Sequence, residues 1–136
     1  MLFRSELLTA YGYKKLAFAN AVKDLALAID PYVAVLTPDG QAIYTRLSRL
    51  VNEHGWTYAK GFHDVRRLLQ RVGTEGGREL LGEFTWINIL SRDIEPGVDY
   101  VIDDVRFLNE ASWIRYGGGV IWKILRPGYN GDGHAS

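Results

Sequence analysis

Apolar residues recur at helical spacing along most of the chain. The clearest stripe, at positions i, i+3, i+4 and i+7, consists of Val65, Leu68, Leu69 and Val72. We expect Gly73 to end that helix. The same periodicity, with turn residues between segments, predicts further helices over residues 3–10, 22–30, 44–60, 75–81, 86–94 and 109–116.

Short β-rich runs separate these helices. Tyr100 to Ile102 and Val120 to Leu125 are apolar throughout, as buried parallel strands are. Strands are also expected over residues 15–19 and 32–36, and the turn residues 38–40 predict a small hairpin after the second of these. Alternation of strands and helices predicts an α/β fold with a parallel sheet. We expect one domain over residues 1–128 and a turn-like, flexible tail over 129–136.

Composition narrows the class of protein. The chain has 136 residues, of which 47% are hydrophobic, and its formal net charge is zero. A nucleic-acid-binding domain is usually strongly basic, so nucleic acid is not an expected partner. Cysteine is absent, which excludes disulfides and thiolate zinc sites. Because no apolar run approaches the ~20 residues of a membrane helix, and the first residues are too charged for a signal peptide, we expect a soluble cytoplasmic protein.

The first candidate site is the segment Asp103 to Glu110, DDVRFLNE. Carboxylates at the end of a parallel strand face the crevice where α/β proteins bind ligands. There a carboxylate can hold a hydrated magnesium ion, and Arg106 can bind phosphate through its planar fork of donors. In the alternative interpretation Asn109 caps the next helix and Arg106 pairs with Asp103 or Asp104.

The second candidate site lies on the polar face of the helix that carries the apolar stripe. Arg67 and Arg71 are one turn apart and can point to one place, while Gln70 can present its amide to a base edge. Thr74 adds a hydroxyl, and Arg78 adds a third guanidinium after a glycine turn. The alternative is a solvated helix face on which Arg71 pairs with the glutamate four residues later.

One tryptophan and two basic residues outside these segments can each be interpreted in two ways. Trp86 follows the arginine-rich segment, where it could stack against a base or belong to the core. Lys23 and Arg46 could reach a phosphate, although each such residue is more often an ordinary surface charge. No GxxxxGK[ST] loop is present among the 136 residues, because no glycine cluster is followed by a lysine.

Three ordered blocks of the chain resemble phage deoxynucleoside monophosphate kinases. Residues 16–27, LAFANAVKDLAL, are similar to the family's sFAdplK stretch. Residues 66–86, RRLLQRVGTEGGRELLGEFTW, are similar to its R-x-LLQ-x-GTE-x-GR segment, and residues 100–128 to its DVRF-x-NE, GG and RPG motifs. The resemblance implies a P-loop kinase fold and transfer of the γ-phosphate of ATP, with Mg²⁺, to a deoxynucleoside monophosphate, yielding the diphosphate.

Residue roles follow from the same resemblance. The motif positions imply that the monophosphate site is lined by Lys23, Arg67, Gln70, Thr74, Arg78 and Trp86. Asp104 and Arg106 would be the catalytic residues near the metal and phosphates, with Asp104 contacting Mg²⁺ indirectly. Arg126 would flank the ATP base.

The chain departs from the family pattern at several positions. Asn20 and Ala21 replace Asp and Pro, Leu108 replaces Pro, and Phe84 replaces an acid. The first residues resemble the helix that follows the family's glycine-rich loop, and the last residues stop short of a further helix. We therefore expect a truncated P-loop-kinase-like sheet, with weak or no catalysis by this chain alone because that loop provides most of the phosphate cradle.

The same departure bears on partners. A sheet without its usual first strand would leave ladder groups unpaired, so we expect a homo-oligomer or a second chain that completes the sheet. The alternative function is a non-catalytic phage protein, a pseudokinase in effect, that uses the kinase scaffold to bind a protein partner. If the chain is phage-encoded, the expected location is the host cytoplasm.

Overall fold

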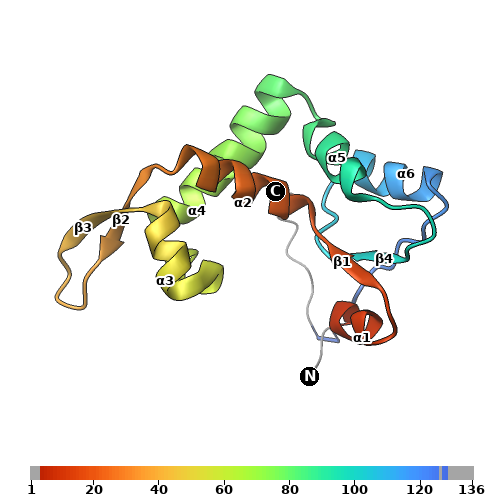
Figure 1. The fold of residues 1–136 in the computed structure, drawn as a ribbon, viewed down its shortest axis with the longest axis horizontal. Helices are drawn as coiled ribbons and strands as arrows, with labels where there is room; N and C mark the ends of the chain where they lie inside the picture. Colours follow the sequence, from red (N-terminus) through yellow and green to blue (C-terminus); the bar gives the residue numbers. More distant parts are fainter. Residues whose placement is uncertain (1–3, 126, 129–136) are drawn as a thin grey trace.

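The computed structural model describes residues 4–125 and 127–128, and Figure 1 shows their path. Within these residues no helix is long and apolar enough to cross a membrane. The elements are, in chain order, α1 (Arg4–Ala10), β1 (Lys14–Leu16), α2 (Phe18–Ile29), β2 (Tyr32–Leu36), β3 (Ala42–Arg46), α3 (Leu47–Ala59), α4 (His63–Gln70), the π-helix η1 (Arg71–Leu81), α5 (Thr85–Leu90), the 3₁₀ turn η2 (Ser91–Asp93), β4 (Tyr100–Ile102) and α6 (Leu108–Tyr116).

Two small sheets organise these elements. β1 pairs in parallel with β4, with Lys15 opposite Val101. β2 and β3 form an antiparallel hairpin in which Ala34 lies opposite Tyr44. Helices flank the parallel pair, and the hairpin stands apart from it (Figure 1). The prediction of a mixed α/β fold with a small parallel sheet, flanking helices and a hairpin is confirmed at this level.

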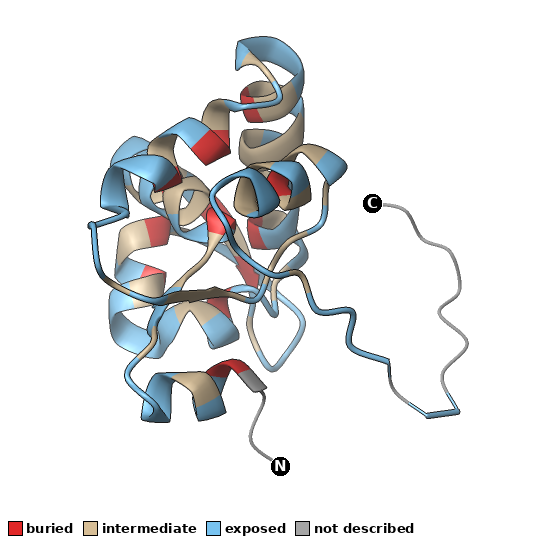
Figure 2. Ribbon diagram, turned by 90° about the vertical axis from the view of Figure 1, so that its right-hand side faces the viewer, coloured by how far each residue is buried: buried red, intermediate tan, exposed pale blue. Residues whose placement is uncertain are grey.

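Two hydrophobic clusters form the core, and Figure 2 shows the buried positions as short stretches on otherwise exposed or half-buried helices. One lies under the hairpin and α3, and the other lies between α5 and the parallel strands. α2 contributes Ala26 to the first cluster and Phe18 to the second. The α4–η1 helix also contributes to both, through Val65 and Val72. These two helices, α2 and α4–η1, therefore connect the two hydrophobic clusters.

The first strand is shorter than expected and the following helix begins earlier. β1 ends at Leu16 instead of residue 19, and α2 begins at Phe18 instead of Val22. The reason is a long-range cap. The carboxylate of Asp104 accepts hydrogen bonds from the backbone N–H groups of Phe18, at 3.0 Å, and Ala19, at 2.9 Å. These donors would otherwise be unsatisfied at the helix start.

The helix predicted over residues 44–60 is wrong in its first part. Residues 42–46 form β3, because they complete the ladder with β2. α3 starts only at Leu47, where the carboxylate of Asp30 accepts hydrogen bonds from the backbone N–H and hydroxyl of Ser48 at 2.8 and 2.9 Å. Gly55, with φ of 80°, kinks the helix, and an L side chain rarely adopts that conformation.

Two further expectations are corrected. Gly73 does not end a helix, because α4 continues directly into η1, whose wider turns run to Leu81. Gly73 and Gly77 do not stop the helix; they leave room for the side chain of Trp86 to pack against it. Val120 to Leu125 do not form a strand, since no described strand pairs with them, and most of their side chains are exposed. The tail beyond residue 128 lies outside the described residues.

Candidate functional site

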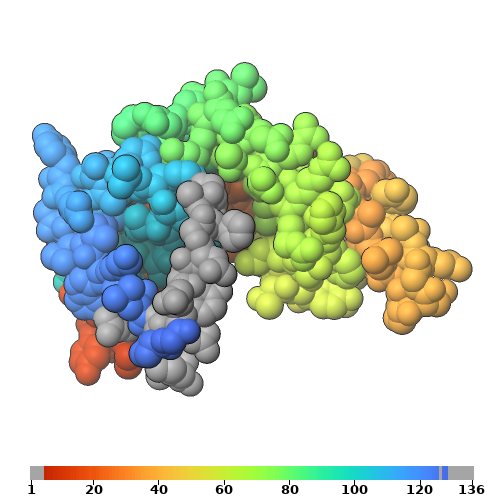
Figure 3. Space-filling view, turned by 180° about the vertical axis from the view of Figure 1, so that it is seen from behind, coloured from red at the N-terminus to blue at the C-terminus, as the bar shows by residue number. Residues whose placement is uncertain are grey.

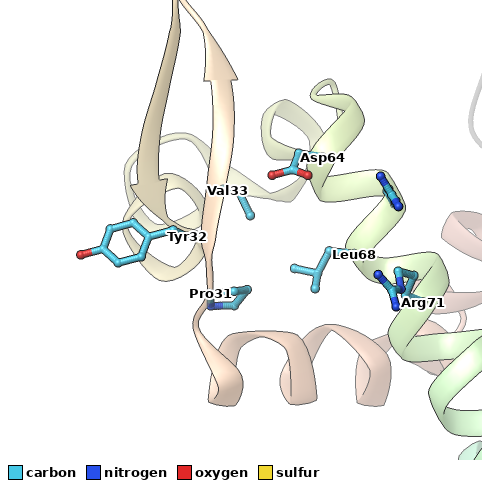
Figure 4. A pocket seen from close by; sticks show the side chains of 7 residues that line it. Pro31, Tyr32, Val33, Asp64, Leu68 and Arg71 are labelled. Carbon is cyan, nitrogen blue, oxygen red and sulfur yellow. The ribbon is translucent and has the colours of Figure 1, made fainter.

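A cavity of about 300 Å³ opens between β2 and the start of α4, above the end of α2 (Figure 4). Its walls combine apolar and charged groups. The lining residues are Pro31, Tyr32, Val33, Asp64, Arg67, Leu68 and Arg71. We refer to it as the arginine cavity. A partly apolar recess with a few convergent polar groups is the usual form of a small-molecule site.

Arg67 and Arg71 supply the positive charge of the arginine cavity. They are one helical turn apart, on α4 and at the start of η1, and both line the cavity as their spacing predicted. The alternative contact is also present, because Nε of Arg71 lies 3.3 Å from a carboxylate oxygen of Glu75. Arg67 is exposed and makes no ion pair within the part of the chain that the structure describes. Its guanidinium is therefore available to an anion.

Asp64 joins the two walls of the arginine cavity. Its carboxylate accepts a hydrogen bond of 2.8 Å from the backbone N–H of Ala34, in the middle of β2. The contact attaches the first turn of α4 to the strand, and so holds the arginines at a constant position relative to Tyr32. The sequence could not show this contact between Asp64 and Ala34, since no local pattern connects residues thirty positions apart.

The other residues expected at the monophosphate site are spread along the same helix. Gln70 is the exposed last residue of α4 and Thr74 is half-buried in η1, and neither lines the arginine cavity. Arg78, near the far end of η1, donates a hydrogen bond of 3.1 Å to the carbonyl of Glu83. Its guanidinium also lies 3.6 Å from the ring centre of Phe107, a cation–π contact. The structure therefore brings Arg78 to the DVRF segment and away from the cavity.

Lys23 belongs to a different surface again. It is half-buried on α2, with its ammonium 5.7 Å from the ring centre of Trp56. Burial lowers the pKa of Lys23, and the positive charge of Lys60 lowers it further, while Asp104 opposes them. Lys60 was not singled out from the sequence. No described contact joins Lys23 to the residues of the arginine cavity.

The two aspartates after β4 are each engaged by the protein. Asp103 forms an ion pair of 2.7 Å with Lys15. Burial acts to raise the pKa of Asp103, but hydrogen bonds from Lys15 and Ser5 and the charge of Lys15 outweigh it, so the pKa is lowered. The alternative in which Arg106 pairs with one of these aspartates is wrong for the described residues, where Asp103 pairs with Lys15 and Asp104 caps α2.

Glu110, the last residue of this segment, is the one that anchors the start of α6. It is only 4% exposed, and its carboxylate accepts hydrogen bonds from the backbone N–H groups of Arg106 at 2.8 Å and Phe107 at 3.0 Å. It thereby caps α6 and sets the direction of the chain at Arg106, whose side chain is exposed. Asn109 contributes in part as the alternative expected. The N-cap residue is Phe107, but Oδ1 of Asn109 accepts a hydrogen bond of 3.1 Å from the backbone N–H of Glu110 in the first turn, and its amide nitrogen donates one of 2.9 Å to the carbonyl of Glu83.

The donor set around Asp104 bears on the expected magnesium. Among the described residues no group of three or more His, Cys, Asp or Glu side chains is placed to hold a metal ion. Asp104 uses one lone pair of each oxygen to cap α2, which leaves further lone pairs for a metal-bound water. Mg²⁺ usually keeps several waters and needs few protein ligands. The residues fit indirect contact only, and that role of Asp104 stays a prediction.

Trp86 occupies the core position that the sequence left open. It is 4% exposed, and its indole N–H donates a hydrogen bond of 2.7 Å to the carbonyl of Gly73. From there it supports the helix that carries the arginines, and its role at a base stays a prediction. Arg126, expected beside the ATP base, lies outside the described residues.

Fold and site together define a small α/β chain with an arginine-lined cavity suited to an anionic small molecule. Comparison with curated proteins finds a deoxynucleoside-5'-monophosphate kinase of Escherichia phage T5, 47% identical over 57 residues. The match covers 40% of this chain and 22% of that kinase, so the chain spans about a fifth of the relative's length. No protein-family model and no solved structure matches the chain.

Proposed function

We propose that the chain binds a deoxynucleoside monophosphate, with the phosphate held at the arginine cavity. The observation that carries the proposal is the convergence of Arg67 and Arg71 on one recess. Guanidinium groups bind phosphate oxygens through paired, charge-assisted hydrogen bonds. The similarity to a phage deoxynucleoside-5'-monophosphate kinase supports the same class of ligand.

The remaining motif residues take supporting roles in this proposal. Gln70 presents its amide to the base edge, and Thr74 offers a hydroxyl from the next turn. Lys23 and Arg78 lie outside the arginine cavity, and their part in the monophosphate site rests on the resemblance alone. Trp86 holds the arginine-bearing helix through its hydrogen bond to the carbonyl of Gly73. Such a division places phosphate and base contacts on one continuous helix, α4–η1.

The ancestral reaction in this proposal is phosphoryl transfer from ATP, in the P-loop kinase fold. Asp104 and Arg106 would lie near the transferred phosphate, and Arg126 near the ATP base. Bound Mg²⁺ would neutralise charge on the ATP phosphates. The 136 residues contain no GxxxxGK[ST] loop, whose backbone N–H groups and lysine cradle those phosphates. We therefore propose that this chain binds the acceptor and transfers phosphate weakly or not at all by itself.

Isothermal titration calorimetry with the four deoxynucleoside monophosphates tests the acceptor site. Arg67→Ala removes the unpaired guanidinium, and we expect affinity to fall roughly tenfold to a hundredfold, the value of a charged hydrogen bond. Arg67→Lys should recover only part of it, because a lysine lacks the planar fork. Arg92→Ala is the matched control, since Arg92 is an exposed arginine on η2 outside the cavity.

The proposal is wrong if none of the four nucleotides binds saturably, or if Arg67→Ala and Arg92→Ala bind alike. A phosphoryl-transfer assay with ATP and Mg²⁺ is run on the same samples. Saturable binding without turnover supports acceptor binding by a weak catalyst. Turnover at an ordinary kinase rate would keep the binding proposal and overturn the proposed weakness of catalysis.

A further inference from the structure

The pattern of hydrogen-bonded and non-hydrogen-bonded pairs in the β2–β3 hairpin determines which backbone groups of β3 face away from β2. The N–H of Thr37 donates to the carbonyl of Gln41 at 2.8 Å, and that of Leu47 to Pro31 at 3.0 Å. In an antiparallel pair hydrogen-bonded and non-bonded positions alternate. Ala42, Tyr44 and Arg46 consequently occupy the non-bonded positions, and their N–H and C=O groups point away from β2.

The two edges of the hairpin differ. On the β2 edge the N–H of Ala34 donates to the carboxylate of Asp64, and α4 packs beside the strand. On the β3 edge no acceptor for the N–H of Ala42 or Tyr44 is found within the described residues. An unpaired edge is a template for another strand, and proteins usually protect it with charged side chains, proline or a bulge. The sequence AIYTR of β3 contains no proline and no bulge, and its one charge is at Arg46, the last residue of the strand.

Side chains on this edge are apolar and exposed. The hairpin projects at one end of the molecule (Figure 3), away from the parallel sheet. Tyr44 is 71% exposed, and Leu36, on the same face of the hairpin, is 65% exposed. The one charged side chain of β3, Arg46, lies over the ring of Tyr32 at 4.2 Å. The edge therefore offers both unpaired backbone and apolar surface.

We propose that β3 is a self-association edge, which pairs antiparallel with β3 of a second copy of this chain. The two-fold axis passes beside Tyr44, so the two Tyr44 residues are directly opposite each other. Residue 42 of one copy then faces residue 46 of the other, and 43 faces 45. The outward backbone groups of Tyr44 and its neighbours meet their equivalents, and the two hairpins become one four-stranded sheet.

The sequence of β3 suits a second copy because it is self-complementary about Tyr44. The register opposes Arg46 to an alanine, so no like charges meet across the axis. It also places two tyrosines side by side, and aromatic cross-strand pairs are favourable. A two-fold contact of this kind is closed, which gives a dimer and not a fibre.

The dimer is expected to be weak, because a five-residue strand pair is smaller than a standard interface. Interfaces that bury less than about 1,200 Å² in total are typically transient. Sedimentation velocity over a series of protein concentrations should therefore show a monomer–dimer equilibrium, with dimer increasing as concentration rises. The pairing strand β3 contributes no residue to the arginine cavity, so the association is expected without nucleotide.

Substitutions that place a charge at Tyr44, beside the proposed two-fold axis, test the register of the β3–β3 pair. Tyr44→Lys and Tyr44→Glu each place like charges opposite each other, and each variant alone should lose the dimer. An equimolar mixture should associate more tightly than either variant alone, because the heterodimer pairs opposite charges. Tyr11→Lys is the control, since Tyr11 is 81% exposed and lies outside the hairpin. Circular dichroism melts check that every variant is folded.

A concentration-independent monomer for the unmodified chain would overturn the proposal. So would a dimer that survives both charged variants, or a mixture that associates no better than its components. Tyr44→Pro supplies a second measurement, because Pro removes only an outward N–H at this position and leaves the bonds to β2 in place. A folded Tyr44→Pro variant should be monomeric, and a folded dimer of it contradicts backbone pairing.

Discussion

Gly77 lies against the indole of Trp86, and no side chain larger than hydrogen fits between them. A Cβ at position 77 would overlap Cζ2 of the ring. The indole N–H meanwhile donates to the carbonyl of Gly73, four residues earlier in the same helix. Trp86 therefore enters the side of η1 at two points. The contact explains why glycines occur inside this helix without ending it.

Gly77→Ala should destabilise the protein by about 1–3 kcal/mol, as overpacking of a tight core does. Gly73→Ala is the matched control, because a Cβ there meets Val22 at an ordinary 3.4 Å and Ala favours a helix. Urea unfolding followed by tryptophan fluorescence measures both. Equal stability of the two variants would contradict the close packing of Gly77 and Trp86.

Asp104 is both the cap of α2 and a candidate catalytic residue, and these roles are separable. Asp104→Ala should lower the free energy of unfolding by about 0.5–2 kcal/mol, the usual cost of losing a helix cap. Asp104→Asn keeps one acceptor oxygen and should lose less stability. Thermal unfolding monitored by circular dichroism is the measurement. If Asp104→Ala is as stable as the unmodified chain, the hydrogen bonds to Phe18 and Ala19 do not stabilise the helix.

The Asp103–Lys15 ion pair predicts a defined dependence of stability on pH. The carboxyl pKa of Asp103 is lowered in the fold, so its contribution is present above the ordinary value of 3.8 and is lost as pH falls through the folded pKa. The pKa of Lys15 is raised, chiefly by the hydrogen bond to Asp103. Its contribution is present below 10.5 and is lost as pH rises through the raised value.

The difference in Tm between the unmodified chain and Asp103→Asn should therefore be largest between pH 3.8 and 10.5 and shrink outside that window. Salt should reduce the difference, because both side chains are partly exposed. A difference in Tm that is the same at pH 2 and pH 7 would exclude the ion pair as its cause.

Glu75 competes with the proposed substrate for Arg71. Glu75→Gln removes the negative charge 3.3 Å from the Arg71 guanidinium, so nucleotide monophosphate affinity should rise severalfold, in line with the roughly 0.5 kcal/mol of an exposed ion pair and the removal of one negative charge. Glu79→Gln, an exposed substitution on the same helix, is the control. Calorimetry at low ionic strength compares them. An equal gain in both variants would indicate general electrostatics and would argue against a phosphate at Arg71.

Local patterns along the sequence determined much of this protein. The apolar stripe of Val65, Leu68 and Leu69 predicted α4, and the run from Tyr100 to Ile102 predicted β4 with its correct bounds. The spacing of Arg67 and Arg71 predicted that both face one place. Each of these depends on periodicity within a few residues, which the chain carries by itself.

Only the tertiary structure decided the features that join distant residues. Asp104 sets the start of α2 from 85 residues away, and Asp64 closes the arginine cavity against Ala34. Gly73 was predicted to end a helix, but it lies inside one and its carbonyl accepts a hydrogen bond from Trp86. Tyr44 was predicted to be helical, but it lies in a strand because it pairs with β2. In each case a hydrogen bond or packing contact made across the fold outweighs a local preference of well under 1 kcal/mol per residue.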